Sequence, residues 1–363
     1  MFSRKTNEYI KTLERITSRY DLPNELTDTA LNNLVSASGS LPSIWGLCGR
    51  DVSALDFKAV SGETFIKLAF NEYTVFPADF MIDYKRILEE SKKPGLGVSE
   101  IHKRGINGNG VNVAVIDKPI LETHQELTGR IKKYELINPE NEYNEEMHFH
   151  GMTCAAFLCG NDCGAANGAN LYYYVYPDKF EDDGMYWGYH FKALDMIAEH
   201  NQANPADTIK IVSISAGFPR DRTDLTDKMN DYAEKLKKTG CYTIFSNVFG
   251  ETFSCASKIT SFDNDDPDNY KLDSWQNDWH KRQILIPSGG RTSPCCSGND
   301  KYIYNGNQSC FSWAIPYLCG VFALALQVDK SLSYMDFCEK AKKTATVGTE
   351  GLYIINPTKI VFE

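Results

Sequence analysis

The sequence lacks the long apolar runs that membrane spans require. No uninterrupted apolar stretch approaches the roughly 18 residues of a transmembrane helix, and Met1–Lys5 leads into polar sequence without the apolar core of a secretion signal. The chain also lacks an excess of positive charge, since 38 Lys and Arg face 48 Asp and Glu, for a formal net charge of −10. Because nucleic acids and anionic membranes bind basic surfaces, we expect neither as a partner.

Paired cysteine motifs are absent as well. The eleven cysteines are an odd number, contain no Cys-x-x-Cys pair and include the neighbours Cys295 and Cys296, so reduced thiols fit better than a disulfide framework. Cys154, Cys159 and Cys163 fall in one apolar, small-residue region and are interpreted as core residues rather than zinc ligands. We therefore expect a cytoplasmic protein without a metal or cofactor.

The 363 residues divide into two regions that differ in their pattern of predicted helices and strands. Residues 1–94 mix helix-like stretches at Thr6–Tyr20 and Tyr84–Ser91 with a strand-like one at Thr64–Phe70. The breaker cluster Lys92–Gly97 then predicts a boundary, which gives an N-terminal extension (1–94) and a larger domain (95–363).

The larger domain alternates short apolar strands with helices. Predicted strands are Val111–Ile116, Leu171–Val175, Ile209–Ser215, Cys241–Ser246 and Ile284–Ile286, and predicted helices are His150–Leu158, Met185–Gln202, Asp224–Lys238, Ser312–Gln327 and Tyr334–Thr344. Such alternation predicts an α/β fold with a parallel sheet covered on both faces and ligands at the carboxyl ends of its strands. Asp117, Ser215 and Asn247 all lie at such ends.

Three residues carry the candidate chemistry. Ser312 stands where turn-forming sequence becomes an apolar helix, and Pro316, four residues on, is tolerable only near a helix start. Asp117 closes an apolar strand, and His150 opens a small-residue helix. Each alone fits a structural role, but a hydroxyl, an imidazole base and a buried carboxylate together are what nucleophilic catalysis needs.

Five segments match one known family in register: Gly105–Asp117, His150–Thr153, Gly168–Tyr172, Ser213–Gly217 and the pattern of Ser312, Pro316 and Gly320. From about Gly95 to its end the chain resembles the subtilisin-like serine proteases, or subtilases. The resemblance implies a three-layer fold with a central, mostly parallel sheet and serine endopeptidase activity on peptide or protein substrates. It further implies that Asp117, His150 and Ser312 are the catalytic triad. Asn247 would serve the oxyanion hole, and Ser215, Ala216 and Gly217 would bind substrate.

Several departures from the family pattern leave a second hypothesis open. Cys310-Phe311 replaces Gly-Thr before the nucleophile, and Met152-Thr153 alters the histidine motif. A catalytically degenerate subtilase fold, acting as a binding or regulatory module, is therefore the alternative. Ile244 and Phe245 replace small residues, which predicts a shallow or altered specificity pocket.

Metal binding is not expected in two further segments. The loop between the histidine helix and the Leu171 strand looks short, so we expect no calcium there. The acidic segment Asp263–Asn269 lacks the ordered spacing of a calcium loop and is interpreted as a solvated loop, with metal binding as the less favoured reading.

Residues 1–94 occupy the place of a family propeptide. Apolar stretches within them, such as Phe65–Phe76, predict an ordered subdomain that docks on the peptidase domain and is retained. The alternative is an ordinary propeptide that is removed by cleavage near Lys93–Gly97.

Overall fold

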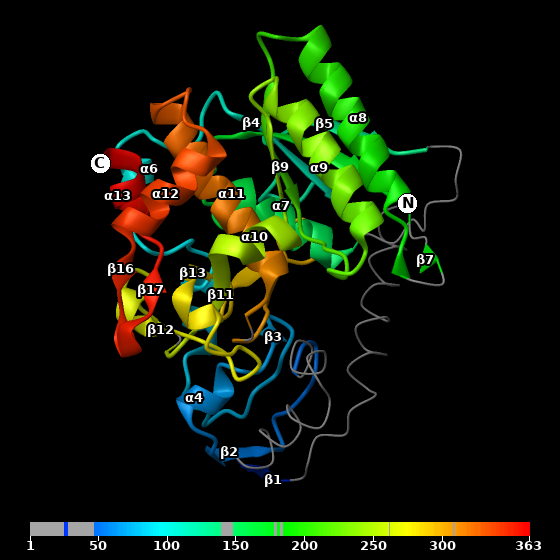
Figure 1. The fold of residues 1–363 in the computed structure, drawn as a ribbon. Coiled ribbons are helices and arrows are strands. Elements are labelled where there is room, and N and C mark those ends of the chain that lie inside the picture. Colours follow the sequence, from blue (N-terminus) through cyan, green and yellow to red (C-terminus); the bar gives the residue numbers. More distant parts are fainter. Residues whose placement is uncertain are drawn as a thin grey trace.

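The computed structural model describes residues 25–27, 47–138, 148–177, 180–181, 184–260, 262–307 and 309–363. The predicted helix at Thr6–Tyr20 lies outside these residues. In Figure 1 the described part of the N-terminal extension forms the lower end of the molecule, and the larger domain lies above it.

A five-stranded, fully parallel sheet forms the centre of the larger domain. In spatial order its strands are β10 (Tyr242–Phe245), β9 (Ile209–Ile214), β4 (Asn112–Asp117), β6 (Asn170–Val175) and β5 (Ile131–Leu136). Four of them confirm predicted strands. The edge strand β5 was missed because its sequence, IKKYEL, keeps only half-buried or exposed side chains and shows no apolar run.

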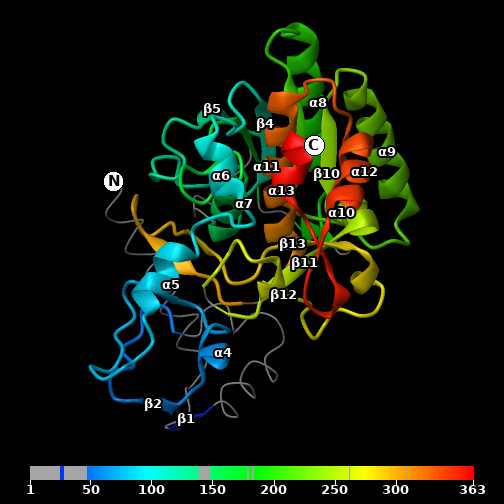
Figure 2. The ribbon, with the colours of Figure 1, turned by 90° about the vertical axis from the view of Figure 1, so that its left-hand side faces the viewer.

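Helices cover both faces of this sheet because side chains alternate along each strand. Val113 and Val115 of β4 pack in one core cluster with α7 (Phe149–Cys159) and α11 (Phe311–Val328). Ala114 and Ile116 pack in the other with α8 (Gly188–Ala203) and α9 (Thr223–Lys237), on the opposite side of the sheet (Figure 2). This is the predicted three-layer α/β architecture.

Helix α11 runs through the first of these core clusters. Among the described residues it is the one helix long and apolar enough to cross a membrane, but 78% of that window is buried inside the protein. Its composition is therefore that of a core helix.

Further elements complete the larger domain. A second sheet has the order β12 (Tyr270–Lys271), β11 (Phe253–Lys258), β13 (Ile284–Pro287), β17 (Tyr353–Ile354) and β16 (Thr346–Val347). Further helices of this domain are α6 (Val98–Lys103), α10 (Ser246–Thr252), α12 (Tyr334–Thr344) and α13 (Pro357–Phe362), and short 3₁₀ turns occur at Pro267–Asn269, His280–Arg282 and Thr349–Gly351. Strand β7 (Phe180–Glu181) pairs with β8 (Gly184–Met185) in this domain, whereas β1 (Glu25–Thr27) pairs with β2 (Asp56–Ala59) in the N-terminal extension.

One secondary-structure prediction for the N-terminal extension is wrong. The segment Thr64–Phe70, predicted as a strand, contains the end of helix α4 (Gly62–Phe65), and only Phe70 belongs to strand β3 (Phe70–Asn71). The physical reason is local, because the Ser61 hydroxyl accepts a hydrogen bond from Thr64 N at 3.2 Å and caps the helix. The predicted helix at Tyr84–Ser91 is confirmed as α5 (Tyr84–Glu90).

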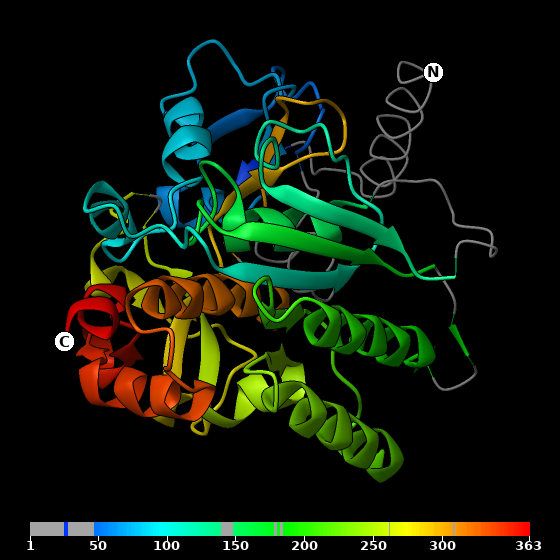
Figure 3. The ribbon, with the colours of Figure 1, turned by 90° about the horizontal axis from the view of Figure 1, so that it is seen from above.

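The extension contacts the larger domain through a strand. Strand β3 pairs antiparallel with β15 (Tyr302–Tyr304), which pairs in turn with β14 (Thr292–Pro294) (Figure 3). The Tyr304 ring stacks on Phe70 at 4.8 Å, and its hydroxyl donates to the Ile66 carbonyl at 3.0 Å. Backbone and aromatic contacts thus join the two regions just before the segment that carries Ser312.

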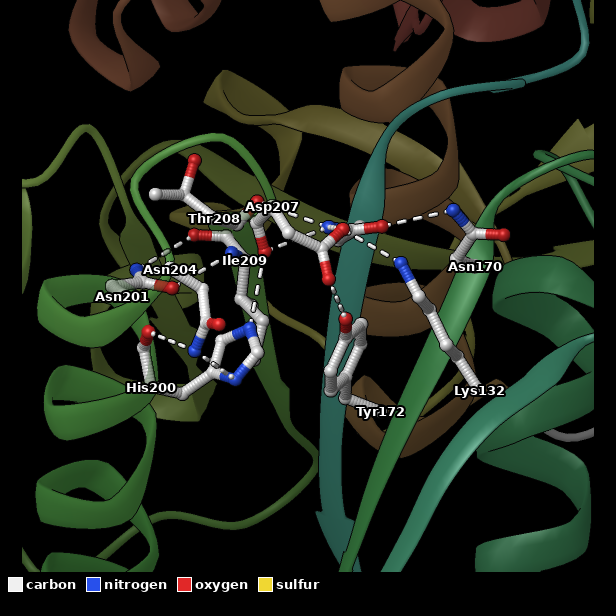
Figure 4. Close-up of polar contacts among 10 residues, drawn as sticks. Lys132, Asn170, Tyr172, His200, Asn201, Asn204, Asp207, Thr208 and Ile209 are labelled. Atoms are coloured by element: carbon white, nitrogen blue, oxygen red, sulfur yellow. Dashed lines mark hydrogen bonds and ion pairs between the residues drawn. The ribbon is translucent and has the colours of Figure 1, made fainter.

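A polar network closes the amino edge of the central sheet, away from the predicted site (Figure 4). Asp207 accepts hydrogen bonds from Lys132 Nζ at 2.6 Å, Tyr172 Oη at 2.7 Å and Asn112 Nδ2 at 2.9 Å. These three donors, with Lys132 the largest contributor, hold the pKa of Asp207 below its ordinary value. Since the three donors come from β5, β6 and β4, this carboxylate ties three neighbouring strands together.

Candidate active site

Asp117 is the last residue of β4 and is only 1% exposed. Its carboxylate accepts a hydrogen bond from Lys118 N at 2.8 Å, and its two oxygens lie 3.0 and 2.9 Å from His150 Nδ1. A buried carboxylate is costly unless such bonds satisfy it. The structure therefore brings Asp117 and His150 together as a hydrogen-bonded pair.

The start of α7 positions His150. The residue before the helix, His148, accepts a hydrogen bond from His150 N through its Nδ1 at 3.1 Å. Gly151 has no space for a side chain, because an added Cβ would stand 2.2 Å from Tyr173 Oη and 2.7 Å from the Lys118 carbonyl. A glycine is thus required for α7 to approach the end of β4, and this approach brings the imidazole to Asp117.

Opposing effects set the pKa values of the pair. Burial by itself lowers the pKa of His150, but the Asp117 charge and hydrogen bond outweigh burial and raise it. Burial by itself raises the pKa of Asp117, but the charge and hydrogen bond of His150 outweigh burial and lower it. For His148, burial and then repulsion from His150 lower the pKa to about 4, so His148 is neutral near pH 7.

Ser312 lies in the first turn of α11, beside the Asp117–His150 pair. Its hydroxyl donates to the Ser215 carbonyl at 3.4 Å, and within the described residues it makes no hydrogen bond to His150. The ring of the next residue, Trp313, lies 5.3 Å from that of His150, centroid to centroid. Cys154 links the two elements, with its Sγ 3.8 Å from His150 Nδ1 and 3.5 Å from the Ser312 carbonyl oxygen.

Pro316 explains the contacts of the Ser312 carbonyl. Proline has no N–H, so the carbonyl four residues earlier in the helix loses its usual partner. Here Ser215 Oγ donates to the Ser312 carbonyl at 2.9 Å, and the Cys154 thiol adds a weaker contact. The proline therefore frees an acceptor that anchors the first turn of α11 to the end of β9 and to α7.

The side-chain amide of Asn247 is already hydrogen-bonded to the backbone of Phe218. It lies in α10, where its Nδ2 donates to the Phe218 carbonyl at 3.0 Å and its Oδ1 accepts from Phe218 N at 3.2 Å. One of the two Nδ2 protons is left for a ligand. The Ser312 N–H lies in the first turn of α11, where backbone N–H groups have no helical partner.

A pocket of about 580 Å³ opens next to these two residues. Its walls include Gly217, Asn247 and Phe311, together with the aromatic side chains of Phe218, Trp275 and Trp279 and the polar side chains of Arg220, Asn277 and His280. Ile244 and Phe245, which were expected to make the specificity pocket shallow or altered, do not line this pocket, because both side chains are buried in the core clusters of the central sheet. The pocket is therefore not filled by these larger side chains.

The aromatic wall was missed in the sequence. Trp275 and Trp279 lie between β12 and β13 and keep 47% and 56% of their surface exposed. Two tryptophans four residues apart in a polar segment were the available signal, since exposed aromatics of this kind mark binding surfaces. The Trp275 ring lies 6.2 Å from that of Phe311, which connects the wall to the first turn of α11.

Two groups of side chains have the chemistry of metal ligands. Asp117, His150 and Cys154 place one ligand atom each within 4.8 Å of one another, but the Asp117–His150 separation is that of a hydrogen bond and burial raises the pKa of the Cys154 thiol. In the acidic segment, Asp265 Oδ1 accepts from Gly97 N at 2.8 Å, and Asp266 accepts from Asp268 N at 2.9 Å. The interpretation of Asp263–Asn269 as a solvated loop stays a prediction, since Asp263, Asp265 and Asp268 are exposed and two of its carboxylates also bond backbone amides.

Among solved structures, the chain is similar to subtilisin-like proteinases. A crystal structure of a cold-adapted subtilisin-like serine proteinase matches 68% of this chain and 89% of its own, with 16% identity and a TM-score of 0.48. Fervidolysin from Fervidobacterium pennivorans, described as a keratinolytic enzyme related to subtilisin, matches with 13% identity and a TM-score of 0.52. That match covers 76% of this chain and 47% of fervidolysin, so it spans about half of that protein's length. A search of curated protein sequences found no match.

The sequence model of the subtilase family, Peptidase_S8, matches residues 108–308. This segment includes the strand that ends at Asp117, the helix that begins at His150 and the end of β9, and it is more than half of the chain. The protein therefore belongs to the subtilase family.

Proposed function

We propose that the protein is a serine endopeptidase in which Ser312 attacks the peptide carbonyl, His150 transfers the proton and Asp117 orients His150. Family membership supports serine peptidase activity in general. The observation that carries the specific assignment is the hydrogen-bonded pair of the buried Asp117 and the half-buried His150, beside the first turn of α11, which contains Ser312. The family match ends before Ser312, so the role of this serine depends on its position in the site.

The geometry of His150 suits a general base. Its Nδ1 faces the carboxylate, which favours the tautomer that carries its proton on Nδ1 and leaves Nε2 free to accept one. The proton of Ser312 Oγ then moves to Nε2, and Asp117 stabilises the imidazolium that results. The present bond from Ser312 Oγ to the Ser215 carbonyl, at 3.4 Å, is long and therefore weak. Rotation of the hydroxyl toward His150 thus costs little.

Two donors are available for the tetrahedral oxyanion. The Ser312 N–H is one, and the second Nδ2 proton of Asn247 is the other. In subtilisin, loss of the asparagine donor raises the barrier by about 2.7–4 kcal/mol. Here the two hydrogen bonds between Asn247 and the backbone of Phe218 hold the Asn247 amide in place, so this side chain would reorganise little when the intermediate forms.

The pocket suggests which side chain precedes the scissile bond. It adjoins Phe311 and Asn247, so a side chain that enters it belongs to the residue whose carbonyl reaches Ser312. Its aromatic wall favours a large apolar or aromatic side chain. Among the described residues no carboxylate lines the pocket, whereas the cationic Arg220 does, so we propose that lysine and arginine are disfavoured there. Ser215, Ala216 and Gly217 would hold the substrate backbone.

The alternative is a degenerate subtilase fold that binds peptides without cleaving them. Two observations favour it: the Ser312 hydroxyl is not bonded to His150, and Asn247 already bonds Phe218. In this case the pocket would still receive a side chain, and no covalent step would follow.

A fluorophosphonate probe separates the two hypotheses. The probe forms a covalent bond only with an activated serine, so wild-type protein should gain its mass on the peptide that contains Ser312. Ser312→Ala should gain none and His150→Ala far less, while Ser331→Ala, which replaces an exposed serine beyond the far end of α11, should label like wild type. Binding of peptides by unlabelled wild-type protein, without hydrolysis, would support the degenerate module instead.

We also propose that the extension stays attached, and that the protein acts in the cytoplasm on peptides or proteins rather than on nucleic acids or membranes. The boundary segment is held by bonds from the larger domain: Thr292 N donates to the Ser91 carbonyl at 2.9 Å, and Arg291 Nη2 donates to the Lys92 carbonyl at 3.1 Å. A peptidase needs an accessible, extended segment as its substrate. These bonds oppose cleavage near Lys93–Gly97 and support retention.

A further inference from the structure

Two cationic side chains are buried together outside the candidate active site. Lys258 ends β11 and Arg291 precedes β14, and each is only 1% exposed. Within the described part of the chain, Lys258 Nζ and Arg291 Nη1 are buried without a hydrogen-bond partner. Charged groups are almost never buried unless they are paired, because they lose their hydration. This pair therefore calls for a compensating group.

The two cations are close enough to repel each other. An added Cβ on Gly290, the neighbour of Arg291, would stand only 3.1 Å from Lys258 Cδ. Burial and then the charge of Arg291 lower the pKa of Lys258, and no carboxylate contributes in the opposite direction. No acidic side chain therefore neutralises a positive charge at Lys258. At Arg291 the buried carboxylate of Glu126 contributes, but as the weakest of the effects that oppose burial.

The remaining contacts of Arg291 fix its orientation. Its Nε donates to the Ser91 carbonyl at 3.4 Å, and its Nη2 donates to the carbonyls of Lys92 and Cys163 at 3.1 and 2.9 Å. The guanidinium also lies over the Phe157 ring, 4.2 Å from its centroid. Nη1 is the nitrogen left over. Among the described residues the hydroxyl of Ser91, whose carbonyl accepts from Arg291 Nε, is likewise buried and without a hydrogen-bond partner.

We propose that Lys258 and Arg291 form a buried binding site for a small monovalent anion of the chloride type. An ammonium, a guanidinium N–H and a hydroxyl are all hydrogen-bond donors, and the first two bring positive charge that an anion neutralises. A small anion is favoured because the surroundings are densely packed, with Gly290 against the Lys258 stem and Phe157 under the guanidinium.

The position of this anion site gives it a structural consequence. Arg291 holds the boundary of the extension at Ser91 and Lys92, whereas Lys258 is bonded to the segment that leads to Ser312. Asn307, five residues before Ser312, accepts from Lys258 N through its Oδ1 at 2.7 Å and donates to the Lys258 carbonyl. A bound anion would therefore stabilise the extension boundary and the nucleophile segment together, whether or not the protein is a peptidase.

The test measures stability against chloride at constant ionic strength. Wild-type protein is unfolded in urea while sodium chloride replaces sodium gluconate. Because the anion binds only the folded state, each tenfold rise in chloride above its dissociation constant should raise the folding equilibrium constant about tenfold. Lys258→Met, which keeps the stem and removes the charge, should lose this dependence. Lys237→Met, which removes an exposed lysine on α9, should keep it.

A second measurement avoids reliance on a variant that fails to fold. Crystals of wild-type protein grown in sodium bromide should show an anomalous peak between Lys258 Nζ and Arg291 Nη1. Stability of the wild-type protein that does not change when chloride replaces gluconate, or a bromide-free site in those crystals, would mean that Lys258 is a neutral amine and that the proposal is wrong.

Discussion

Replacement of Asp117 by asparagine tests how the Asp117–His150 pair acts. The change keeps the shape of the side chain and removes its charge. In the wild-type protein both carboxylate oxygens face His150 Nδ1, and one also accepts from Lys118 N. An asparagine has one oxygen for these two donors, and its NH₂ favours the imidazole tautomer whose proton is on Nε2. That tautomer cannot accept the proton of Ser312.

The expected loss follows from the tautomer. Related substitutions lower kcat by about 10⁴ in serine proteases, and loss of the aspartate lowers it by about 3 × 10⁴ in subtilisin. We expect a similar loss here, which corresponds to roughly 5–6 kcal/mol of barrier at about 1.36 kcal/mol for each factor of ten. The pKa of His150 should move from above to below 6.5, because burial then acts without the opposing carboxylate.

The pH dependence of stability gives an independent check. The raised pKa of His150 stabilises the fold fully below the unfolded value of about 6.5, and this stabilisation is lost as pH rises through the folded pKa. The lowered pKa of Asp117 stabilises the fold above about 3.9, and this is lost as pH falls through the folded pKa. The penalty of Asp117→Asn should therefore be largest between about pH 4 and 6.5.

Three measurements decide the outcome. Peptide hydrolysis gives kcat, NMR of the imidazole Cε1–H gives the pKa of His150, and urea unfolding across pH gives the stability difference. Ser312→Ala is the background for NMR, so that the protein cannot digest itself. Asp224→Asn, which removes a surface carboxylate paired with Arg222, should change none of the three. A kcat within tenfold of wild type, or an unchanged pKa of His150, would refute the reasoning.

Four further outcomes are expected. Ser312→Ala should lower peptide hydrolysis by about 10⁶ without a shift in the unfolding midpoint, and hydrolysis at wild-type rate would identify a different nucleophile. Trp279→Ala should lower kcat/KM about tenfold for substrates with an aromatic residue before the scissile bond, because about 50–60 Å² of apolar contact is lost, and should spare those with alanine there. On incubation, the wild-type protein should keep its mass of 40.9 kDa, whereas the Arg291→Met variant should be cut at the boundary of the extension. If the wild-type protein lost residues 1–94 in a reaction that requires Ser312, the proposed retention would be wrong. Asp207→Asn should lower the free energy of unfolding by about 1 kcal/mol at pH 7, a value reduced by solvent screening because the side chain is 41% exposed. This loss of stability should vanish as pH falls below about 4 and through the lowered pKa of Asp207.

Local sequence patterns predicted most of the elements that position the site. The predicted strands at Leu171–Val175 and Ile284–Ile286 each match the structure to within one residue at either end, and the helix Tyr334–Thr344 matches at both ends. Such elements are fixed by apolar runs and capping residues that lie next to one another in the chain. The prediction at Thr64–Phe70 failed because one serine cap outweighed the β-prone composition of the segment.

The aromatic wall of the pocket is a feature that local sequence patterns do not predict. Trp275 and Trp279 line one pocket with Phe311 only because tertiary packing brings the segment between β12 and β13 beside α10 and the start of α11. The pairing of β3 with β15 likewise joins residues more than two hundred positions apart. Neither contact leaves a periodic signal in the sequence.

By itself, the sequence determined that an aspartate ends a buried strand, that a histidine and a serine begin buried helices, and that a proline follows the serine by one turn. These are properties of short segments, governed by hydrophobic periodicity and by the missing N–H of proline. Only the tertiary structure decided that Ser215 donates to the carbonyl that Pro316 leaves free, and that Lys258 is buried beside Arg291. Those contacts depend on the packing of distant segments, because a side chain's partners and its loss of hydration are set by what surrounds it in space.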